Sequence, residues 1–349
     1  MKAAVLEGIE KIKIIDVPVP EIKADEALLK VEFCGICGTD IKIYKSGYRD
    51  SIDENSRRIL GHEVVGTLVD VGEDISFLSK GMRVGIAPSF GCGICYQCIS
   101  GNPNLCIHPN AFGVTHDGGF AEYMLITSKA ISSGNVIPLS DRVSPDVACL
   151  AEPLSCCING HEALGIELAD QVLVIGAGPI GIMHLLLSKL NGASRVIVSE
   201  INEARIEKLS IFKPDFVINP SRENITERIR EITDGHMADK VIVAVSSAQA
   251  QNQAIEFAGI KAKILLFAGL AKEQPMVSMD SNQIHYKQLS IFGTTGSNVR
   301  QYIRAMNLIE SGAIEIEKLI SDRIPLSDFA QGLKKAQEGT GMKVLIHPT

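Results

Sequence analysis

The chain has 349 residues, of which 46% are hydrophobic and 21% are charged, and its formal net charge is −7. This length predicts about two domains, and the composition excludes a disordered protein because the apolar residues suffice for a core. The negative balance argues against a nucleic-acid partner. The longest apolar stretch, residues 172–187, is interrupted by glycines, a proline and a histidine, so it predicts no membrane span. Because residues 1–10 contain no apolar leader, we expect a cytoplasmic enzyme.

The N-terminal part of the chain is predicted to be rich in short β-strands. Runs of β-branched residues, separated by Gly, Pro and Asp, predict strands at 27–33, 66–71, 82–86 and 121–126. No long helical period occurs before about residue 145, and a helix is then predicted over 147–164.

From residue 171 onward, apolar strands alternate with helices. The predicted strands are 172–175, 195–199, 216–219, 240–245, 263–267 and 289–292. The predicted helices between them include 180–190, 203–212, 226–233 and 248–258. Six apolar strands joined by helices indicate an α/β fold with a doubly wound parallel sheet that can bind a nucleotide. The tail predicts a helix at 299–311, a helix from Ser327 and a strand at 343–346.

Four of the nine cysteines follow a C-x2-C-x2-C-x7-C pattern. An odd number of cysteines argues against a disulfide framework, whereas the short spacings allow the thiolates to converge on one ion. Four sulfur ligands suit tetrahedral Zn²⁺ and leave no open position for a substrate. We therefore predict a structural zinc site, formed by Cys92, Cys95, Cys98 and Cys106.

A glycine-rich turn directly follows the predicted strand 172–175 and opens a helix. In the pattern Gly176-x-Gly178-x-x-Gly181, the glycines allow a tight turn, approach of the backbone to a pyrophosphate, and close helix–strand packing. The following helix start, with Pro179 and Ile180, presents free N–H groups to phosphates.

An acidic residue ends the next predicted strand. Glu200 lies at the distance along the chain where a carboxylate accepts hydrogen bonds from the adenosine ribose. Its charge would repel a 2′-phosphate, which favours NAD over NADP, although Arg205 nearby would soften that repulsion. The predicted cofactor contacts also include residues farther along the chain, Val245, Gly269, Gly293 and Thr294.

A second set of metal-ligand candidates is spread along the chain. Cys37, His62, Glu63 and Glu152 offer a mixed sulfur, nitrogen and oxygen set, which suits a catalytic zinc that keeps one position open. Each residue alone has a structural interpretation; Glu152, for example, could be a carboxylate favoured at a helix start. Together with the two motifs above, the metal interpretation is preferred.

Taken together, these motifs resemble those of the zinc-dependent medium-chain alcohol dehydrogenases over nearly the whole chain. The matching segments are Cys37-Gly-Thr39-Asp40, Gly61-His62-Glu63, Gly118 to Tyr123, the four-cysteine lobe and the Gly176 turn. The resemblance implies a GroES-like catalytic domain at 1–147 and 294–349, with the zinc lobe at 88–108. It also implies a Rossmann domain at 148–293.

Within that family, Glu152-Pro153 resembles the sorbitol (polyol) and threonine dehydrogenase branch. By this resemblance, Cys37 and His62 bind a catalytic zinc, and Glu63 and Glu152 serve as exchanging or water-mediated ligands. Thr39 matches the hydroxyl residue that hydrogen-bonds the substrate oxygen. The implied cofactors are two zinc ions per chain and NAD, and the implied assembly is a homodimer or homotetramer.

Three positions depart from the patterns of the family and its branch. Many relatives have a histidine five residues after the cysteine ligand, at the exit of a proton relay, and this chain has Lys42. Ile43 and Gly296 also differ from the residues typical of sorbitol dehydrogenases. The basic residues in the same region are either solvated surface charges or, together with Lys42, hold a phosphorylated or acidic substrate; they are Lys45, Arg49, Arg57 and Arg58. Lys42 thus serves either a phosphorylated substrate or an altered proton relay.

Three functions are compatible with these features. The preferred one is NAD-dependent oxidation of a secondary alcohol in a polyol or sugar-alcohol phosphate. The second is an L-threonine or vicinal-diol (butanediol) dehydrogenase of the same branch. The third is a non-catalytic protein that responds to NAD or zinc, which the complete set of metal candidates and Thr39 disfavours.

Overall fold

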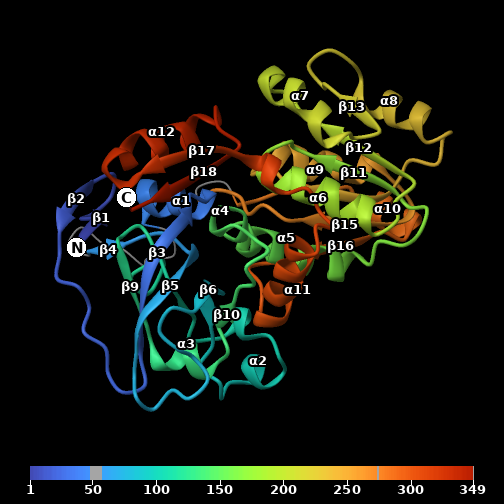
Figure 1. Cartoon of the computed structure of the whole chain (residues 1–349). Coiled ribbons are helices and arrows are strands. Elements are labelled where there is room, and N and C mark those ends of the chain that lie inside the picture. The colour runs from blue at the N-terminus through green and yellow to red at the C-terminus, as the bar shows by residue number, and fades with distance from the viewer. Residues whose placement is uncertain (48–56, 273–274, 349) are drawn as a thin grey trace. The chain divides into compact units, whose positions relative to one another are not determined.

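The computed structural model describes residues 1–47, 57–272 and 275–348, and it divides the chain into two compact units (Figure 1). The first unit comprises residues 1–155 and 296–349, and the second comprises residues 156–295. Arg49, one of the basic residues considered above, lies outside the described residues. In the part of the chain described, no helix is long and apolar enough to cross a membrane.

The first unit is organised around a seven-stranded sheet. Its strands run in the order β10 (Val136–Pro138), β6 (Arg83–Ile86), β5 (Glu63–Val71), β3 (Ala27–Gly35), β18 (Lys343–His347) and β17 (Ile320–Pro325). The seventh strand, β9 (Tyr123–Ile126), also pairs with β3. The last strand of the chain, β18, is antiparallel to β3 and parallel to β17. Strands from the N-terminal and C-terminal parts of the chain therefore pair in one sheet. Residues from both parts also pack in one apolar core.

Smaller elements complete this unit. A three-stranded sheet contains β2 (Ile12–Asp16), β1 (Lys2–Leu6) and β4 (Arg58–Ile59), and a hairpin pairs β7 (Ser89–Phe90) with β8 (Asn110–Ala111). The helices are α1 (Gly38–Ser46), α2 (Tyr96–Ile99), α3 (Ser128–Ser132), α4 (Pro145–Ala148), α11 (Val299–Glu310) and α12 (Phe329–Glu338). The helix α5 (Ala151–Leu164) spans the division between the units.

The second unit contains a six-stranded, entirely parallel sheet. Its order is β13 (Phe216–Ile218), β12 (Arg195–Ser199), β11 (Gln171–Ile175), β14 (Ala238–Val243), β15 (Ala258–Leu266) and β16 (Ser290–Gly293). This is the strand order 3-2-1-4-5-6 of a doubly wound nucleotide-binding sheet, so the predicted fold class is confirmed. The helices are α6 (Pro179–Leu190), α7 (Glu203–Leu209), α8 (Ile225–Ile232), α9 (Ala248–Phe257) and α10 (Ser281–Lys287).

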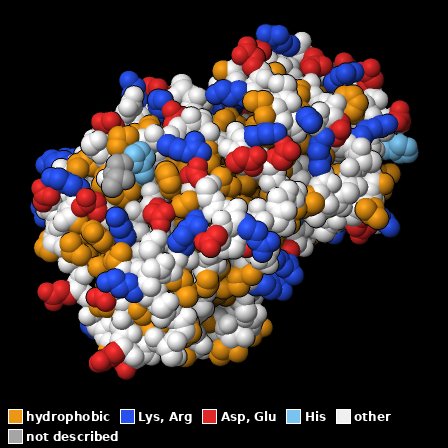
Figure 2. Space-filling view, viewed as in Figure 1, with side chains coloured by type: hydrophobic (Ala, Val, Ile, Leu, Met, Phe, Trp, Pro, Cys, Tyr) orange, Lys and Arg blue, Asp and Glu red, His pale blue; other side chains and the backbone are white. Residues whose placement is uncertain are grey.

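Several local expectations were wrong or incomplete. The helix predicted at 147–164 is two helices, α4 and α5, because the ring of Pro153 disfavours a helical carbonyl at Cys149. The short helices α1 and α3 of the N-terminal part were not predicted, nor were β17 and α10. On the face seen in Figure 2, acidic and basic side chains are interspersed and form no basic stripe.

Candidate metal and cofactor sites

The four cysteines of the predicted structural site converge in one short lobe. The sulfur atoms of Cys92, Cys95, Cys98 and Cys106 all lie within 4.8 Å of one another. The Sγ of Cys95 lies 3.5 Å from that of Cys98 and 3.7 Å from that of Cys106. Bonds of about 2.3 Å in a tetrahedron place sulfur ligands about 3.8 Å apart, so this arrangement fits one Zn²⁺ ion.

Backbone N–H groups of the lobe point at these sulfur atoms. Cys92 N donates to Cys106 Sγ at 3.2 Å, Cys95 N to Cys92 Sγ at 3.3 Å, and His108 N to Cys106 Sγ at 3.3 Å. Hydrogen bonds from the Cys98 and Ile107 backbones lower the pKa of Cys95 to about 6, and those from the Ile94 and Cys95 backbones lower the pKa of Cys92. Burial instead raises the pKa of Cys98 to about 12. The backbone of the lobe therefore favours the thiolate, the form of cysteine that binds a metal, at Cys92 and Cys95.

The second candidate group brings together three residues from two separate segments. Cys37 directly precedes α1, and His62 and Glu63 stand at the start of β5. One potential ligand atom of each lies within 4.8 Å of the others. His62 and Glu63 are buried, and Cys37 is partly buried. A thiolate, an imidazole and a carboxylate at this spacing fit a catalytic zinc site with an open position.

Asp40 connects the segment that carries Cys37 to the segment that carries His62 and Glu63. Its carboxylate accepts hydrogen bonds from Cys37 N at 2.9 Å and from Gly61 N at 3.2 Å. Its Oδ1 lies 3.4 Å from His62 Nδ1. Although burial lowers the pKa of His62, Asp40 and Cys37 raise it well above its usual value. Asp40 thus orients the imidazole; it was quoted in the sequence motif, but no role was predicted for it.

Glu63 is held by a residue from the other end of the chain, which no sequence motif connects with it. Lys343 Nζ donates to Glu63 Oε1 at 2.5 Å and to the Ile36 carbonyl at 3.1 Å. Both side chains are buried. The backbone carbonyl of Glu63 accepts a hydrogen bond from Cys149 Sγ at 2.8 Å.

The remaining predicted catalytic residues lie on nearby elements of the first unit. Thr39 and Lys42 are both in α1 and are partly buried. Glu152 is buried in the first turn of α5, but it is not a member of the three-residue group. The structure therefore brings Cys37, His62 and Glu63 together, whereas Glu152 stays a predicted exchanging ligand.

In the second unit, the glycine turn has the geometry that the sequence motif requires. Gly176 has a φ of 101°, and a Cβ at Gly181 would lie 1.8 Å from the Gly176 carbonyl oxygen. Only glycine allows α6 to begin this close to the end of β11. Gly178 caps α6, with Pro179 and Ile180 in its first turn, so free N–H groups of the helix start are available to a phosphate.

Glu200 links this turn to the next strand. Its carboxylate accepts hydrogen bonds from Ala177 N at 2.7 Å, Ile201 N at 2.8 Å and Asn202 N at 2.9 Å. Arg205 Nη1 lies 3.7 Å from Glu200 Oε2. The carboxylate thus fixes the turn, and the guanidinium offsets part of its charge.

The other predicted cofactor residues share one edge of the sheet. The carboxyl-terminal residues of β11, β12, β14, β15 and β16 stand in register with one another. Val245, Gly269, Gly293 and Thr294 lie at or just beyond these ends. The carboxyl edge of an open parallel sheet is where nucleotides bind.

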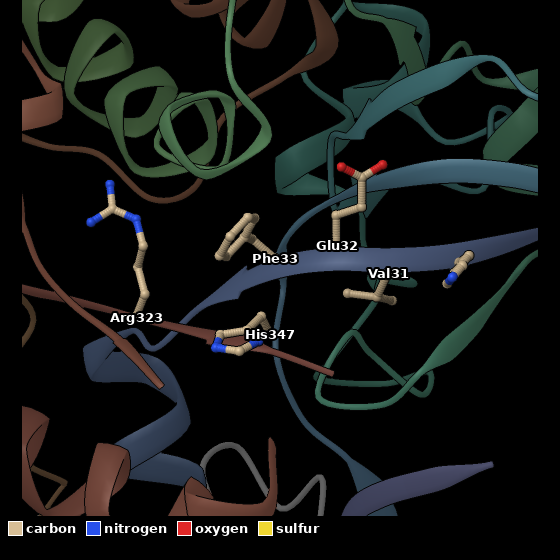
Figure 3. A pocket seen from close by; sticks show the side chains of 6 residues that line it. Val31, Glu32, Phe33, Arg323 and His347 are labelled. Atoms are coloured by element: carbon tan, nitrogen blue, oxygen red, sulfur yellow. The ribbon is translucent and has the colours of Figure 1, made fainter. Parts of the chain in front are cut away.

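A surface pocket lies apart from all of these residues. Figure 3 shows Phe33, Glu32 and Val31 of β3 beside His347 of β18 and Arg323 of β17. Its lining, which also includes Lys30, contains none of the predicted metal or cofactor residues. Arg323 donates from Nε to Asp146 Oδ2 at 2.8 Å. We assign no role to this pocket.

Comparisons with known proteins agree with this picture. The family described as "Alcohol dehydrogenase GroES-like domain" matches residues 23–138, and the family described as "Zinc-binding dehydrogenase" matches residues 179–311. D-arabitol-phosphate dehydrogenase of Enterococcus avium is 30% identical, over 97% of this chain and 94% of that protein. Sorbitol dehydrogenase of Bombyx mori is 31% identical, over 99% of this chain and 98% of that protein.

A solved structure is similar over its whole length. The zinc-binding dehydrogenase from Sinorhizobium meliloti 1021, bound to NADP, superposes with a TM-score of 0.91 and is 29% identical, covering 99% of each chain. Fold and comparisons together define a zinc-binding dehydrogenase with a GroES-like and a Rossmann part. The chain belongs to the zinc-dependent medium-chain alcohol dehydrogenase family and is an oxidoreductase, so the predicted family is confirmed.

Proposed function

We propose that this enzyme oxidises a secondary alcohol of a polyol or sugar-alcohol phosphate and transfers the hydride to NAD. The observation that carries the proposal is the grouping of Cys37, His62 and Glu63 around Asp40 in the first unit. The glycine turn and Glu200 of the second unit support a nicotinamide cofactor. Relatives named for sorbitol and D-arabitol phosphate support a polyol substrate.

Each residue has a task in this proposal. When bound, zinc acidifies a hydroxyl group and NAD accepts a hydride. Cys37 and His62 hold the metal, and Glu63 and Glu152 act as exchanging carboxylates near it. Thr39, in the first turn of α1, orients the substrate by accepting a hydrogen bond from its hydroxyl at Oγ1, and it takes up that proton while passing its own hydroxyl proton into a relay. Four cysteines of the lobe hold the structural zinc.

The preference for NAD is proposed from Glu200. A 2′-phosphate would place a dianion beside a buried carboxylate, and like charges at close range repel. Arg205 lowers that penalty without removing it, because it already faces Glu200. A structural relative is bound to NADP, so a similar fold accepts the phosphorylated cofactor. We expect a higher kcat/KM with NAD than with NADP, and the reverse result would contradict this assignment.

The substrate class is tested by one panel of alcohols. Purified enzyme with NAD is offered sorbitol, arabitol, their phosphates, L-threonine and 2,3-butanediol, and NADH absorbance is followed. We expect the highest kcat/KM with a polyol or its phosphate. A preference for threonine or butanediol would replace the proposed substrate, and no turnover of any alcohol would favour a binding protein.

Lys42 is proposed to contact a phosphate on the substrate. An ammonium group near a catalytic cation is favourable when an anion lies beside both. With Lys42→Ala we expect KM for a phosphorylated polyol to rise by about tenfold or more. KM for the free polyol should change little, and Lys80→Ala, at an exposed lysine elsewhere in the first unit, is the control. A lower kcat for both substrates with a shifted pH profile would instead identify Lys42 as part of a proton relay.

We also propose a cytoplasmic location and a homodimeric or homotetrameric assembly. The family resemblance supports the assembly. The nine cysteines form no predicted disulfide framework, which supports a reducing compartment. Light scattering coupled to size-exclusion chromatography measures the subunit number, and a monomer at micromolar concentration would contradict the predicted assembly.

A further inference from the structure

A buried ion pair stands at the border of the Cys37–His62–Glu63 group. Lys343, in the last strand of the chain, contacts both oxygen atoms of the Glu63 carboxylate and also donates to the Ile36 carbonyl. Glu63 is fully inaccessible, and Lys343 is 4% exposed. Water therefore solvates neither charge, and a buried pair is costly to form. Such a pair at a candidate metal group calls for an explanation other than stability.

The backbone leaves room for this pair. A Cβ at Gly35 would lie 1.9 Å from Glu63 Oε2 and 3.0 Å from Lys343 Cε, so any larger residue would displace them. Gly35 and Cys34 of β3 pair with Leu345 and Ile346 of β18, and Gly35 also pairs with Glu63 of β5. Three adjacent strands thus fix the lysine and the carboxylate relative to each other.

Lys343 and the other candidate ligands surround the Glu63 carboxylate. Lys343 Nζ donates to Oε1 at 2.5 Å and also contacts Oε2. A carboxylate oxygen of Glu63 is also within 4.8 Å of ligand atoms of Cys37 and His62. The carboxylate therefore lies within reach of two cations, the Lys343 ammonium group and a metal ion held by Cys37 and His62.

We propose that Lys343 is a positioning residue that competes with the metal for Glu63. This inference rests on the proposed metal site at Cys37 and His62. With Lys343 in place, Glu63 can leave the metal without becoming an unpaired buried charge, so substrate and ligand can exchange. Without Lys343, Glu63 has one cation to neutralise it and stays bound to the metal.

The test replaces Lys343 by methionine, which has a similar shape and no charge. Removing a nearby positive charge strengthens cation binding, so zinc release to a chelator should slow by about tenfold or more at this site. With Co²⁺ in place of zinc, the visible absorption spectrum should change because the coordination number changes. We expect kcat to fall with KM for NAD unchanged. Lys343→Arg, which keeps the charge, should restore both zinc release and spectrum towards the wild type.

Two controls keep the test specific. Zinc release from the four-cysteine lobe of the same molecule should not change. Lys335→Met, which removes a lysine paired with Asp322 near the surface, should leave both sites unchanged. In a Glu63→Gln background, Lys343→Met should no longer alter the Co²⁺ spectrum, because the lysine acts through Glu63. Lys343→Gln, which retains a donor for the Ile36 carbonyl, repeats the test if the methionine variant does not fold.

The outcomes separate this inference from the function on which it rests. Two zinc ions per chain, with release rate and spectrum unchanged in folded Lys343→Met or Lys343→Gln, would overturn the role of Lys343 alone. One zinc ion per fully active wild-type chain would overturn the proposed metal site itself. Slower release and a changed spectrum that Lys343→Arg reverses would support the proposal.

Discussion

The two candidate metal groups of the first unit are built in opposite ways. The four-cysteine lobe draws its ligands from residues 92–106, and the chain contains no Asp, Glu, Lys or Arg from Val84 to His116. The Cys37 group draws on separate segments and is surrounded by buried charges, Asp40 and Lys343. Ligands from one short segment that carries no charged residue close around an ion, whereas ligands from distant segments with buried charges beside them can be adjusted. The difference predicts a permanent site and an exchangeable one.

The largest expected effect comes from removing the sulfur of the exchangeable site. Cys37→Ser should lower kcat by about a thousandfold or more, because the site loses its thiolate ligand. Metal analysis should find one zinc ion per chain instead of two, and the melting temperature should change little. Cys34→Ser, at a buried cysteine outside the group, is the control for a neighbouring thiol. Retained activity in folded Cys37→Ser would contradict the proposal that the Cys37 group is the catalytic metal site.

The second prediction concerns the permanent site. Cys98→Ser should destabilise the first unit by on the order of 3 kcal/mol, because ion binding contributes folding free energy to the lobe. Limited proteolysis should then cut within residues 88–108 before other parts of the chain. A chelator added to the wild type should remove the ion of the Cys37 group first, with activity lost while the lobe stays protected. If the chelator removed the lobe zinc first, the lobe would be the more labile of the two sites and the prediction would be wrong.

A smaller effect is expected from the residue that orients the imidazole. Asp40→Asn keeps a hydrogen-bond acceptor but removes the charge that raises the pKa of His62. Loss of a residue that orients a metal ligand costs about 10–100-fold in metal affinity or activity. We expect zinc affinity of the Cys37 group to fall by this factor, measured by competition with a chelator dye. Asp322→Asn, a carboxylate paired with Lys335 elsewhere in this unit, should have no effect on affinity.

The same contrast explains what could be predicted from the sequence. The lobe and the Gly176 turn were predictable because their chemistry depends on residues a few positions apart. The doubly wound parallel sheet of the second unit was predictable because apolar strands alternate with helices along the chain. By contrast, Lys343 contacts Glu63 across 280 positions, and no spacing or periodicity connects them. Asp40 carried a readable signal, because a carboxylate three residues after a helix cap accepts the cap's N–H.

Local sequence propensity also failed to predict elements whose secondary structure depends on tertiary contacts. Helix α1 is short and has no strong apolar face, so a periodicity search passes over it. Strand β17 contains Ser321, Asp322 and Arg323, which favour a loop when the segment is considered alone. It becomes a strand because it pairs with β18. Glu152 was predicted as a ligand from a family motif. Such a motif does not determine how far a carboxylate lies from a metal.

The position of β18 has a consequence for the order in which the protein is assembled. Because β18 lies between β3 and β17, the large sheet of the first unit cannot be completed until β18 has been synthesised. The second unit is one continuous segment and can fold before that point. Glu63 is synthesised 280 positions before Lys343. The ligands of the exchangeable site are therefore available to a metal before the lysine that competes for Glu63 is in place.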